Sequence, residues 1–343
     1  MRLKKLFYTI IAPAVAACLP VAGALAQGMH FSQYYNAPML LNPANTALMA
    51  DNDYRVGANY RNQWASIPVP YRTMSAYADF QAMRNSELSN WLGVGVAFFN
   101  DKAGAGDLSL SRTEAFVAYH LQLGYKSMLS AGLSGAYVQR SVDFSKLTFD
   151  MQWDGFSFNG SLPNGEQGGI AKTSFMDVGA GLNYAYYPND NVYLKIGFGL
   201  AHINQPRESF YSMINRMGMR PTGNIDLVLR ANSTFIVNPS VYYTNQKTAS
   251  ELVYGSLFQF WTGGEGTQST QLIIGAFHRW NEAVIGTFGY EWGGLRLMSS
   301  YDFTVSKLSP YNNGQGALEF AVRYQGFYGS GGSARHLYNC PRF

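Results

Sequence analysis

The chain has 343 residues, of which 13% are charged and 15% aromatic, and its formal net charge at pH 7 is +4. A soluble domain normally carries about a quarter charged residues, and the basic residues form no cluster, which argues against a nucleic-acid partner. The near-neutral mean hydropathy excludes a bundle of membrane-spanning helices. Low charge with neutral hydropathy is typical of a transmembrane β-barrel, in which lipid-facing and lumen-facing residues alternate. A large soluble β-sandwich is the alternative.

Residues 1–26 have the pattern of a signal peptide. A basic amino end precedes an apolar stretch over residues 6–19, and Ala24 and Ala26 form a small-residue cleavage site. An alternative interpretation makes Cys18 a lipidated cysteine, although the residues after it stay apolar up to the cleavage site. The pattern predicts export from the cytoplasm.

Residues 27–53 form the second predicted region, a periplasmic segment before the barrel. They are too rich in proline and asparagine to form a strand or a long helix. We expect a tethered segment that is tucked against or into the barrel and can plug it. It leads into a first hairpin, whose strands cover residues 54–64 and 71–80 and are joined by a loop over residues 65–70.

Residues 54–327 repeat one unit, about ten residues of alternating character closed by Gly, Asn, Asp or Pro. The period of two predicts about fourteen strands, each with one apolar face. The other face carries mostly Gly, Ala, Ser and Asn, which suits a crowded barrel interior better than a solvated surface. The fold class predicted is therefore all-β: a closed, antiparallel, up-and-down transmembrane barrel. Aromatic residues at strand ends are expected to form interfacial girdles: Tyr60, Trp64, Trp91, Tyr186, Tyr187, Trp261, Trp280 and Trp292.

The links between strands predict the orientation. With the amino end in the periplasm, mostly short links face the periplasm, including a turn expected at residues 237–239. The outer links include three long ones, at residues 100–111, 140–173 and 203–225. Short periplasmic turns and long outer loops are the usual asymmetry of such barrels.

Charged residues fall on the expected lumen face, with both signs present. Two functions fit them: a selective pore, or a mutually paired network that fills a small barrel, which we favour. The predicted network comprises Asp79, Glu114, Asp177, Lys195, Glu291, Arg296, Asp302, Glu319 and Arg323, with Arg230 and Glu251 on the same face. The five histidines lack zinc-type spacing and nothing marks a nucleophilic serine. We therefore expect no enzyme, no cofactor and no metal site.

Several stretches resemble one known family. They are "FSQYYNAPMLLNPANTA" and "YRNQW…PYRT" within residues 31–73, "GVGVAFFNDKAGAG" at 93–106, "IIGAFHR" at 273–279, "SSYDFTVSKL" at 299–308 and the ending "NCPRF". The chain resembles the PorP/SprF family of the type IX secretion system over residues 31–343.

The resemblance implies a multi-pass barrel in the outer membrane of a Gram-negative bacterium. It would work with periplasmic or lipoprotein components of the secretion apparatus, either as a core component or as a dedicated helper. Its cargo would be a large exported protein with a C-terminal sorting domain, such as a gliding adhesin. The alternative function is an outer-membrane diffusion or fatty-acid-type transport channel.

Two regions outside the barrel are candidate interfaces. The longest outer link carries exposed aromatics, which usually mark an interface, so Phe149, Trp153, Phe156 and Phe158 are the cargo-interface candidates. The alternative is that they fold back over the barrel mouth as a lid. The tail, residues 328–343, begins with a Gly/Ser linker and ends in the periplasmic docking candidates Tyr338, Asn339, Cys340, Pro341, Arg342 and Phe343. A disordered end is the alternative for the tail.

Overall fold

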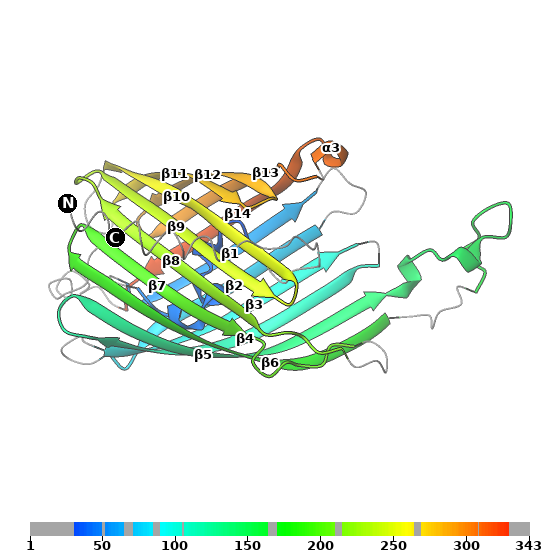
Figure 1. Cartoon of the computed structure of the whole chain (residues 1–343), viewed down its shortest axis with the longest axis horizontal. Helices are drawn as coiled ribbons and strands as arrows, with labels where there is room; N and C mark the ends of the chain where they lie inside the picture. The colour runs from blue at the N-terminus through cyan, green and yellow to red at the C-terminus, as the bar shows by residue number, and fades with distance from the viewer. Residues whose placement is uncertain are drawn as a thin grey trace, which may run out of the picture.

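Fourteen antiparallel strands form a closed barrel in which β1 pairs with β14 and every other strand pairs with its sequence neighbours (Figure 1). The predicted closed barrel of about fourteen strands is confirmed. The computed structural model describes residues 31–49, 52–64, 71–84, 90–104, 106–163, 170–209, 215–263, 269–307 and 309–328. The expected signal peptide and the six docking candidates from Tyr338 to Phe343 lie outside these residues.

The strands vary in length from ten to twenty residues. They are β1 (Tyr54–Gln63), β2 (Tyr71–Ala82), β3 (Asn90–Ala103), β4 (Leu108–Gln122), β5 (Ser127–Asp143), β6 (Ile170–Asn189), β7 (Val192–Ala201), β8 (Arg220–Arg230), β9 (Phe235–Gln246), β10 (Ala249–Gly263), β11 (Thr270–Arg279), β12 (Ala283–Trp292), β13 (Leu295–Thr304) and β14 (Gln315–Gly326). We call the end at which β1 begins the near end of the barrel, and the end at which β1 finishes the distal end.

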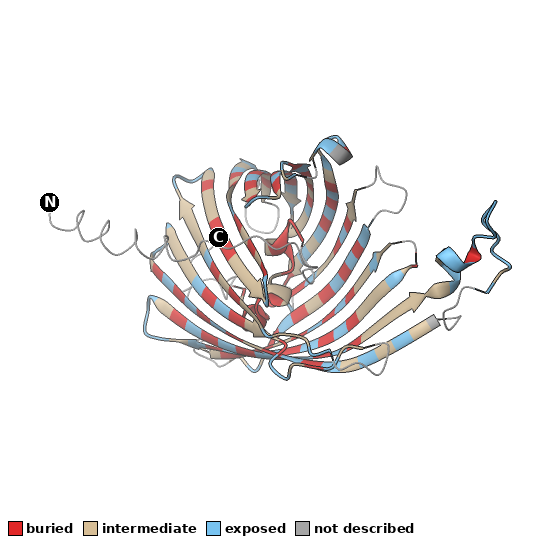
Figure 2. Cartoon of the chain, turned by 45° about the vertical axis from the view of Figure 1, so that its right-hand side comes forward, coloured by how far each residue is buried: buried red, intermediate tan, exposed pale blue. Residues whose placement is uncertain are grey.

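Side chains alternate between the two faces of the wall, as the period of two predicts. On β5, Leu129, Leu133 and Tyr137 are exposed on the outside, whereas Met128 and Ala136 are buried on the inside. The same alternation runs along most strands as stripes of buried and exposed residues (Figure 2). The outer surface is apolar, as a lipid-facing surface must be.

Two of the predicted girdle residues face the lumen instead of the lipid, so their assignment was wrong. Trp91 and Tyr187 are 2% and 5% exposed and lie in one apolar cluster with Met128 and Ala185 at the near end. The reason is alternation: Trp91 precedes the outward-facing Leu92, and Tyr187 follows the exposed Tyr186. Position at a strand end indicates depth in the membrane, but only parity indicates the face.

The turn expected at residues 237–239 is also wrong, because β9 runs through it. Pro239 is opposite Ser256 of β10, and the pairing of β9 with β8 is interrupted between Ser240 and Val237. A proline cannot donate to the ladder, and here the side chain of Asn238 donates to the Leu227 carbonyl at 2.8 Å instead. The turn itself covers residues 231–234.

The distal links are shorter than expected because the strands continue further. β3 and β4 leave only residues 104–107 between them, and β8 already begins at Arg220. The long distal links that remain cover residues 144–169 and 202–219.

Within the residues that the structure describes, helical structure is confined to single turns. Three lie before the barrel, η1 (Tyr34–Asn36), α2 (Pro38–Leu41) and η2 (Pro43–Asn45), two follow β5, η3 (Phe144–Lys146) and η4 (Asp150–Gln152), and one precedes β14, α3 (Ser309–Asn312). No helix in the described ranges is long and apolar enough to cross a membrane.

Candidate functional site in the barrel lumen

Residues 31–49, which we call the inner segment, lie inside the barrel (Figure 2). Their sequence dictates three short turns rather than one helix. Pro38 and Pro43 each open a turn at the first helical position, where no N–H is needed. The Asn42 side chain between them accepts a hydrogen bond from the Ala44 N–H at 2.9 Å and caps the last turn.

The first residues of the inner segment are held in the distal half of the lumen by charged groups. The Ser32 and Gln33 N–H groups donate to the two oxygens of Glu319 at 2.8 and 3.0 Å. The Ser32 hydroxyl donates to Asp302 and accepts from Arg61 at 2.5 Å and from Arg279 at 2.9 Å. Hydrogen bonds to charged groups are about twice as strong as neutral ones, so this end is firmly held.

The last residues of the inner segment are held at the near end. The Ala47 N–H donates to Asp79 at 2.6 Å, and its carbonyl accepts from the Trp91 indole at 3.0 Å. His120 Nε2 lies 2.8 Å from the Thr46 carbonyl. Because a carbonyl can only accept, Nε2 carries the proton, and Nδ1 accepts from the Ser130 hydroxyl at 2.8 Å.

Asparagines fasten the middle of the segment to the opposite wall. The Asn42 amide donates to Asn183 Oδ1 of β6 at 2.9 Å, and the Asn183 amide donates to Asn45 Oδ1 at 3.0 Å. Lys195 of β7 donates to the same Asn45 oxygen at 3.1 Å. The segment is therefore bonded to strands on all sides of the barrel.

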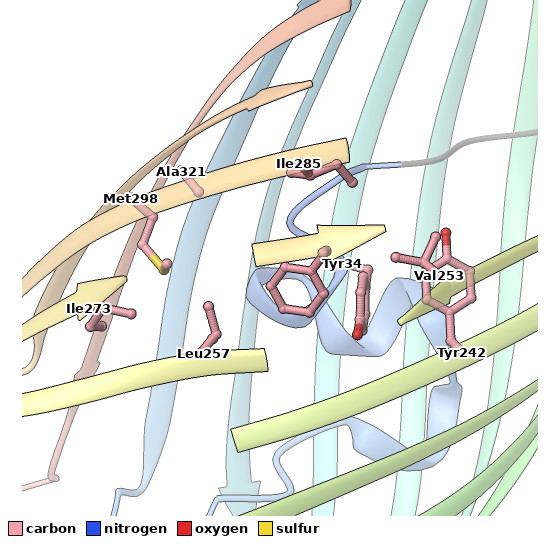
Figure 3. Close-up of a cluster of buried hydrophobic side chains, with 9 residues drawn as sticks. Tyr34, Tyr242, Val253, Leu257, Ile273, Ile285, Met298 and Ala321 are labelled. Atoms are coloured by element: carbon pink, nitrogen blue, oxygen red, sulfur yellow. The ribbon is translucent and has the colours of Figure 1, made fainter. Parts of the chain in front are cut away.

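Apolar side chains fill the space between these polar anchors. Tyr34 packs against Tyr242 with ring centroids 4.6 Å apart and joins a buried cluster contributed by β9 to β14 (Figure 3). Met39, fully buried, joins a second cluster with Tyr77 and Phe116 on the β2 to β4 side. Burial of this apolar surface adds a non-directional contribution to the polar anchoring.

Glycines on the lumen face make room for the inner segment. We call Gly93, Gly95, Gly132, Gly181, Gly197 and Gly199 the glycine cradle, since a Cβ on any of them would press on residues of the segment. A Cβ on Gly181 would overlap Asn42 Oδ1, and one on Gly95 would lie 3.0 Å from Thr46 Cγ2. The small-residue face that indicated a narrow lumen is thus where the backbone of the segment lies closest to the wall.

Gly132→Ala is expected to destabilise the seated segment by about 1–3 kcal/mol, the usual effect of overpacking. The new Cβ would lie 2.5 Å from the Ala44 nitrogen and the Pro43 carbonyl carbon, both backbone atoms that cannot rotate away. Urea unfolding of the detergent-refolded barrel measures the change. Gly135→Ala on the same strand is the control, because its Cβ meets nothing within 4 Å. Equal unfolding midpoints for the two variants would contradict the close fit.

All nine residues of the predicted network face the lumen, and each is ion-paired. Asp79 pairs with Arg55, Glu114 and Asp177 with Arg112, Lys195 with Asp226, Glu291 with Arg296 and Arg323, Asp302 with Arg61 and Arg279, and Glu319 with Arg61. The pairs join side chains from different strands in most cases, so they hold the wall as well as the inner segment.

Four arginines that complete this network were not among the residues predicted from the sequence. Arg55, Arg61, Arg112 and Arg279 are buried in the lumen and hold five of the nine predicted residues. Their positions in the alternating pattern of the strands would have identified them as lumen-facing. Arg55 and Arg61 alternate with Val56 and Tyr60 of β1, which face outward.

The four cargo-interface candidates lie in the arm, our name for residues 144–163. The arm extends beyond the distal end and stands away from the barrel instead of crossing its mouth (Figure 1). Trp153, Phe156 and Phe158 are 57%, 91% and 49% exposed, whereas Phe149 is half-buried. The buried Gln152 organises the arm, since its amide donates to the Leu162 carbonyl at 3.3 Å.

A turn presents the most exposed aromatic of the arm. Asp154 Oδ1 accepts from the Phe156 and Ser157 N–H groups at 2.8 and 2.7 Å. The hydrogen bonds from Ser157 and Phe156 lower the pKa of the Asp154 carboxyl. The turn therefore keeps its charged form at neutral pH.

Within the described ranges, no three His, Cys, Asp or Glu side chains are grouped as a metal site would require. The lumen chemistry is that of hydrogen bonding and ion pairing.

The fold resembles solved outer-membrane channels. The toluene transporter TbuX of Ralstonia pickettii is 10% identical, with a TM-score of 0.53, and the match covers 85% of this chain and 93% of that one. The P. putida toluene transporter TodX is 12% identical with a TM-score of 0.49, over 86% and 95% of the two chains. At these identities the likeness is one of fold.

A comparison with curated protein sequences finds no significant match. Residues 24–324 match the family described as "Type IX secretion system membrane protein PorP/SprF". This match spans most of the chain and confirms the resemblance found in the sequence. The family comprises membrane proteins of a secretion system and not enzymes. The chain belongs to the PorP/SprF family of type IX secretion system membrane proteins.

Proposed function

We propose that the protein is an occluded outer-membrane barrel that anchors an exported surface protein for the type IX secretion system. Residues 1–26 would act as a signal peptide, and the barrel would lie in the outer membrane of a Gram-negative bacterium with its near end in the periplasm. The long distal links and the short near-end turns support this orientation.

The observation that carries the proposal is the occupied lumen. The inner segment is bonded to β14 through Glu319, to β6 through Asn183, to β4 through His120 and to β2 through Asp79. A barrel whose interior is fastened in this way suits a scaffold better than a diffusion pore. The nine network residues would then serve as a structural network rather than as a selectivity filter.

The alternative function is a diffusion or fatty-acid-type transport channel. The likeness in fold to the toluene transporter TbuX favours it, and conductance of the purified barrel separates the two functions. An anchor with a seated inner segment would conduct little, whereas a channel would conduct steadily.

The cargo would bind the arm on the outer side. The proposed cargo is a large exported protein with a C-terminal sorting domain, such as a gliding adhesin. Phe156 and its aromatic neighbours Trp153 and Phe158 supply exposed apolar surface, which usually marks an interface.

The double variant Trp153→Ala with Phe156→Ala is expected to assemble normally but to release the surface protein into the medium. The two rings are exposed, while Gln152 supports the arm independently of them. Hot-spot aromatics each contribute about 2 kcal/mol or more to binding, so the loss of two lowers retention at least tenfold. Quantitative blotting of cells and medium measures it. Tyr125→Ala removes another exposed ring, at the near end, and should leave retention unchanged. Release by that variant as well would contradict the assignment to the arm.

Removal of residues 338–343 is expected to leave cargo retention intact and to abolish co-purification with periplasmic or lipoprotein components. The tail starts at the near end, where the Tyr328 N–H donates to Asp53 at 2.9 Å and its hydroxyl donates to the Gln81 carbonyl at 3.0 Å. Affinity purification from membranes followed by mass spectrometry tests this. Normal recovery of those components with the truncated chain would remove the docking role. A very large exported protein encoded next to this gene would further support a dedicated helper.

A further inference from the structure

A pocket lies in the lumen between the inner segment and β8 to β10. Its empty space, about 530 Å³, includes a part that is open to solvent. Phe31, Tyr34, Leu40 and Leu41 of the inner segment form its apolar side. The opposite side is polar and includes Arg220 at the first residue of β8.

Arg220 is the lumen cation whose guanidinium has no hydrogen-bond or ion-pair partner among the described residues. Its Nε is buried and makes no hydrogen bond. Its charged neighbours already have partners: Arg112 pairs with Glu114 and Asp177, at 2.7 and 2.5 Å, and Glu251 pairs with Arg279 at 3.0 Å. The carboxylates that attract Arg220, those of Glu114, Glu251 and Asp177, are each paired with another arginine. A buried guanidinium nitrogen without a hydrogen-bond partner is costly, so an anion bound in the pocket would stabilise Arg220.

The other polar groups of the pocket are satisfied. Thr244 Oγ1 donates to the Pro221 carbonyl at 3.0 Å and lies 2.9 Å from Thr222 Oγ1, whose proton it accepts. Both hydroxyl protons are therefore used within the wall. Arg220 therefore remains as the side chain that can donate hydrogen bonds to a ligand.

We propose that this pocket binds a monocarboxylate that carries a short apolar group. The planar guanidinium matches a carboxylate with two parallel N–H···O bonds, and the rings and leucines of the inner segment would cover the apolar part. A dianion such as phosphate is disfavoured, because the Glu251 carboxylate also lines the pocket. This inference does not depend on the cargo or on the partners proposed above.

The test is a titration of the purified full-length barrel in nanodiscs, followed by saturation-transfer NMR. The probes are hexanoate, N-acetylleucine, and their neutral counterparts hexanol and N-acetylleucinamide. Both carboxylates are expected to bind saturably and at least about tenfold more tightly than the neutral probes, the effect of about 1.4 kcal/mol from a charged hydrogen bond. Tighter binding of hexanoate assigns the site to a free acid, and tighter binding of N-acetylleucine assigns it to a chain terminus.

Arg220→Gln is expected to abolish this preference, whereas Arg230→Gln, at the other end of the same strand, should retain it. Heat-modifiable migration on a gel reports assembly of each variant. If the glutamine variant does not assemble, Arg220→Lys keeps the charge but loses the bidentate geometry, and weaker carboxylate binding is expected. The inference is overturned if the intact barrel binds no carboxylate, if neutral probes bind equally well, or if the assembled Arg220 variant binds as the wild type does.

Discussion

Deletion of residues 31–45 is expected to turn a barrel that carries little steady current into a conducting one. These residues include all three turns of the inner segment, and their side chains fill the space between the β1, β14 wall and the β6, β7 wall. The wall should survive the deletion, because its ion pairs run from strand to strand: Arg61 to Asp302, and Arg279 to Asp302 and Glu251.

Planar-bilayer recording of refolded protein measures the effect. The intact chain is expected to show rare, small openings, and the deleted chain a stable conductance like that of a small porin. Removal of residues 329–343 deletes the same length from the other terminus and should leave the barrel silent. A large steady conductance from the intact chain would instead support the channel function, and a silent deleted barrel would show that something other than the inner segment blocks the lumen.

Most of the correct predictions rest on the alternation of apolar and small or polar residues along each strand. The faces of β3, β6, β7 and β14 follow from residues such as Val96 and Phe98, which are exposed outside, against Ala97, which is buried inside. Closure of the sheet into a barrel could also be predicted, since every membrane-spanning strand needs a partner on both sides. The lumen position of Asp302 and Glu319 needed only the same parity rule.

The partners inside the lumen could not be predicted, because they depend on how the inner segment folds back. Nothing local to Glu319 indicates that it receives the N–H groups of Ser32 and Gln33, 287 and 286 positions away. Parity alone would have placed Trp91 on the lumen face, but its partner there, the Ala47 carbonyl, is brought to it only by the tertiary fold. The turn predicted at Pro239 was wrong because β9 tolerates the proline: the Asn238 side chain donates to the Leu227 carbonyl where the backbone ladder is interrupted.

Arg279→Gln is expected to destabilise the barrel by about 3–5 kcal/mol, the cost of leaving buried carboxylates without a partner. Arg279 is 1% exposed, contacts Glu251 at 3.0 Å and Asp302 at 3.1 Å, and also donates to the Ser32 hydroxyl at 2.9 Å. Its loss therefore weakens the wall and the anchor of the inner segment together.

The urea midpoint of the heat-modifiable form measures this loss, and the inner segment should also become accessible to protease in the variant that still assembles. Lys146→Gln is the matched control, because it breaks an ion pair with Asp107 in which both side chains are about half exposed. Exposed pairs are screened by water and contribute little, so this control should unfold as the wild type does. If the two variants lose the same stability, the buried network is not what holds the inner segment in the lumen, and its apolar clusters around Tyr34 and Met39 must do so instead.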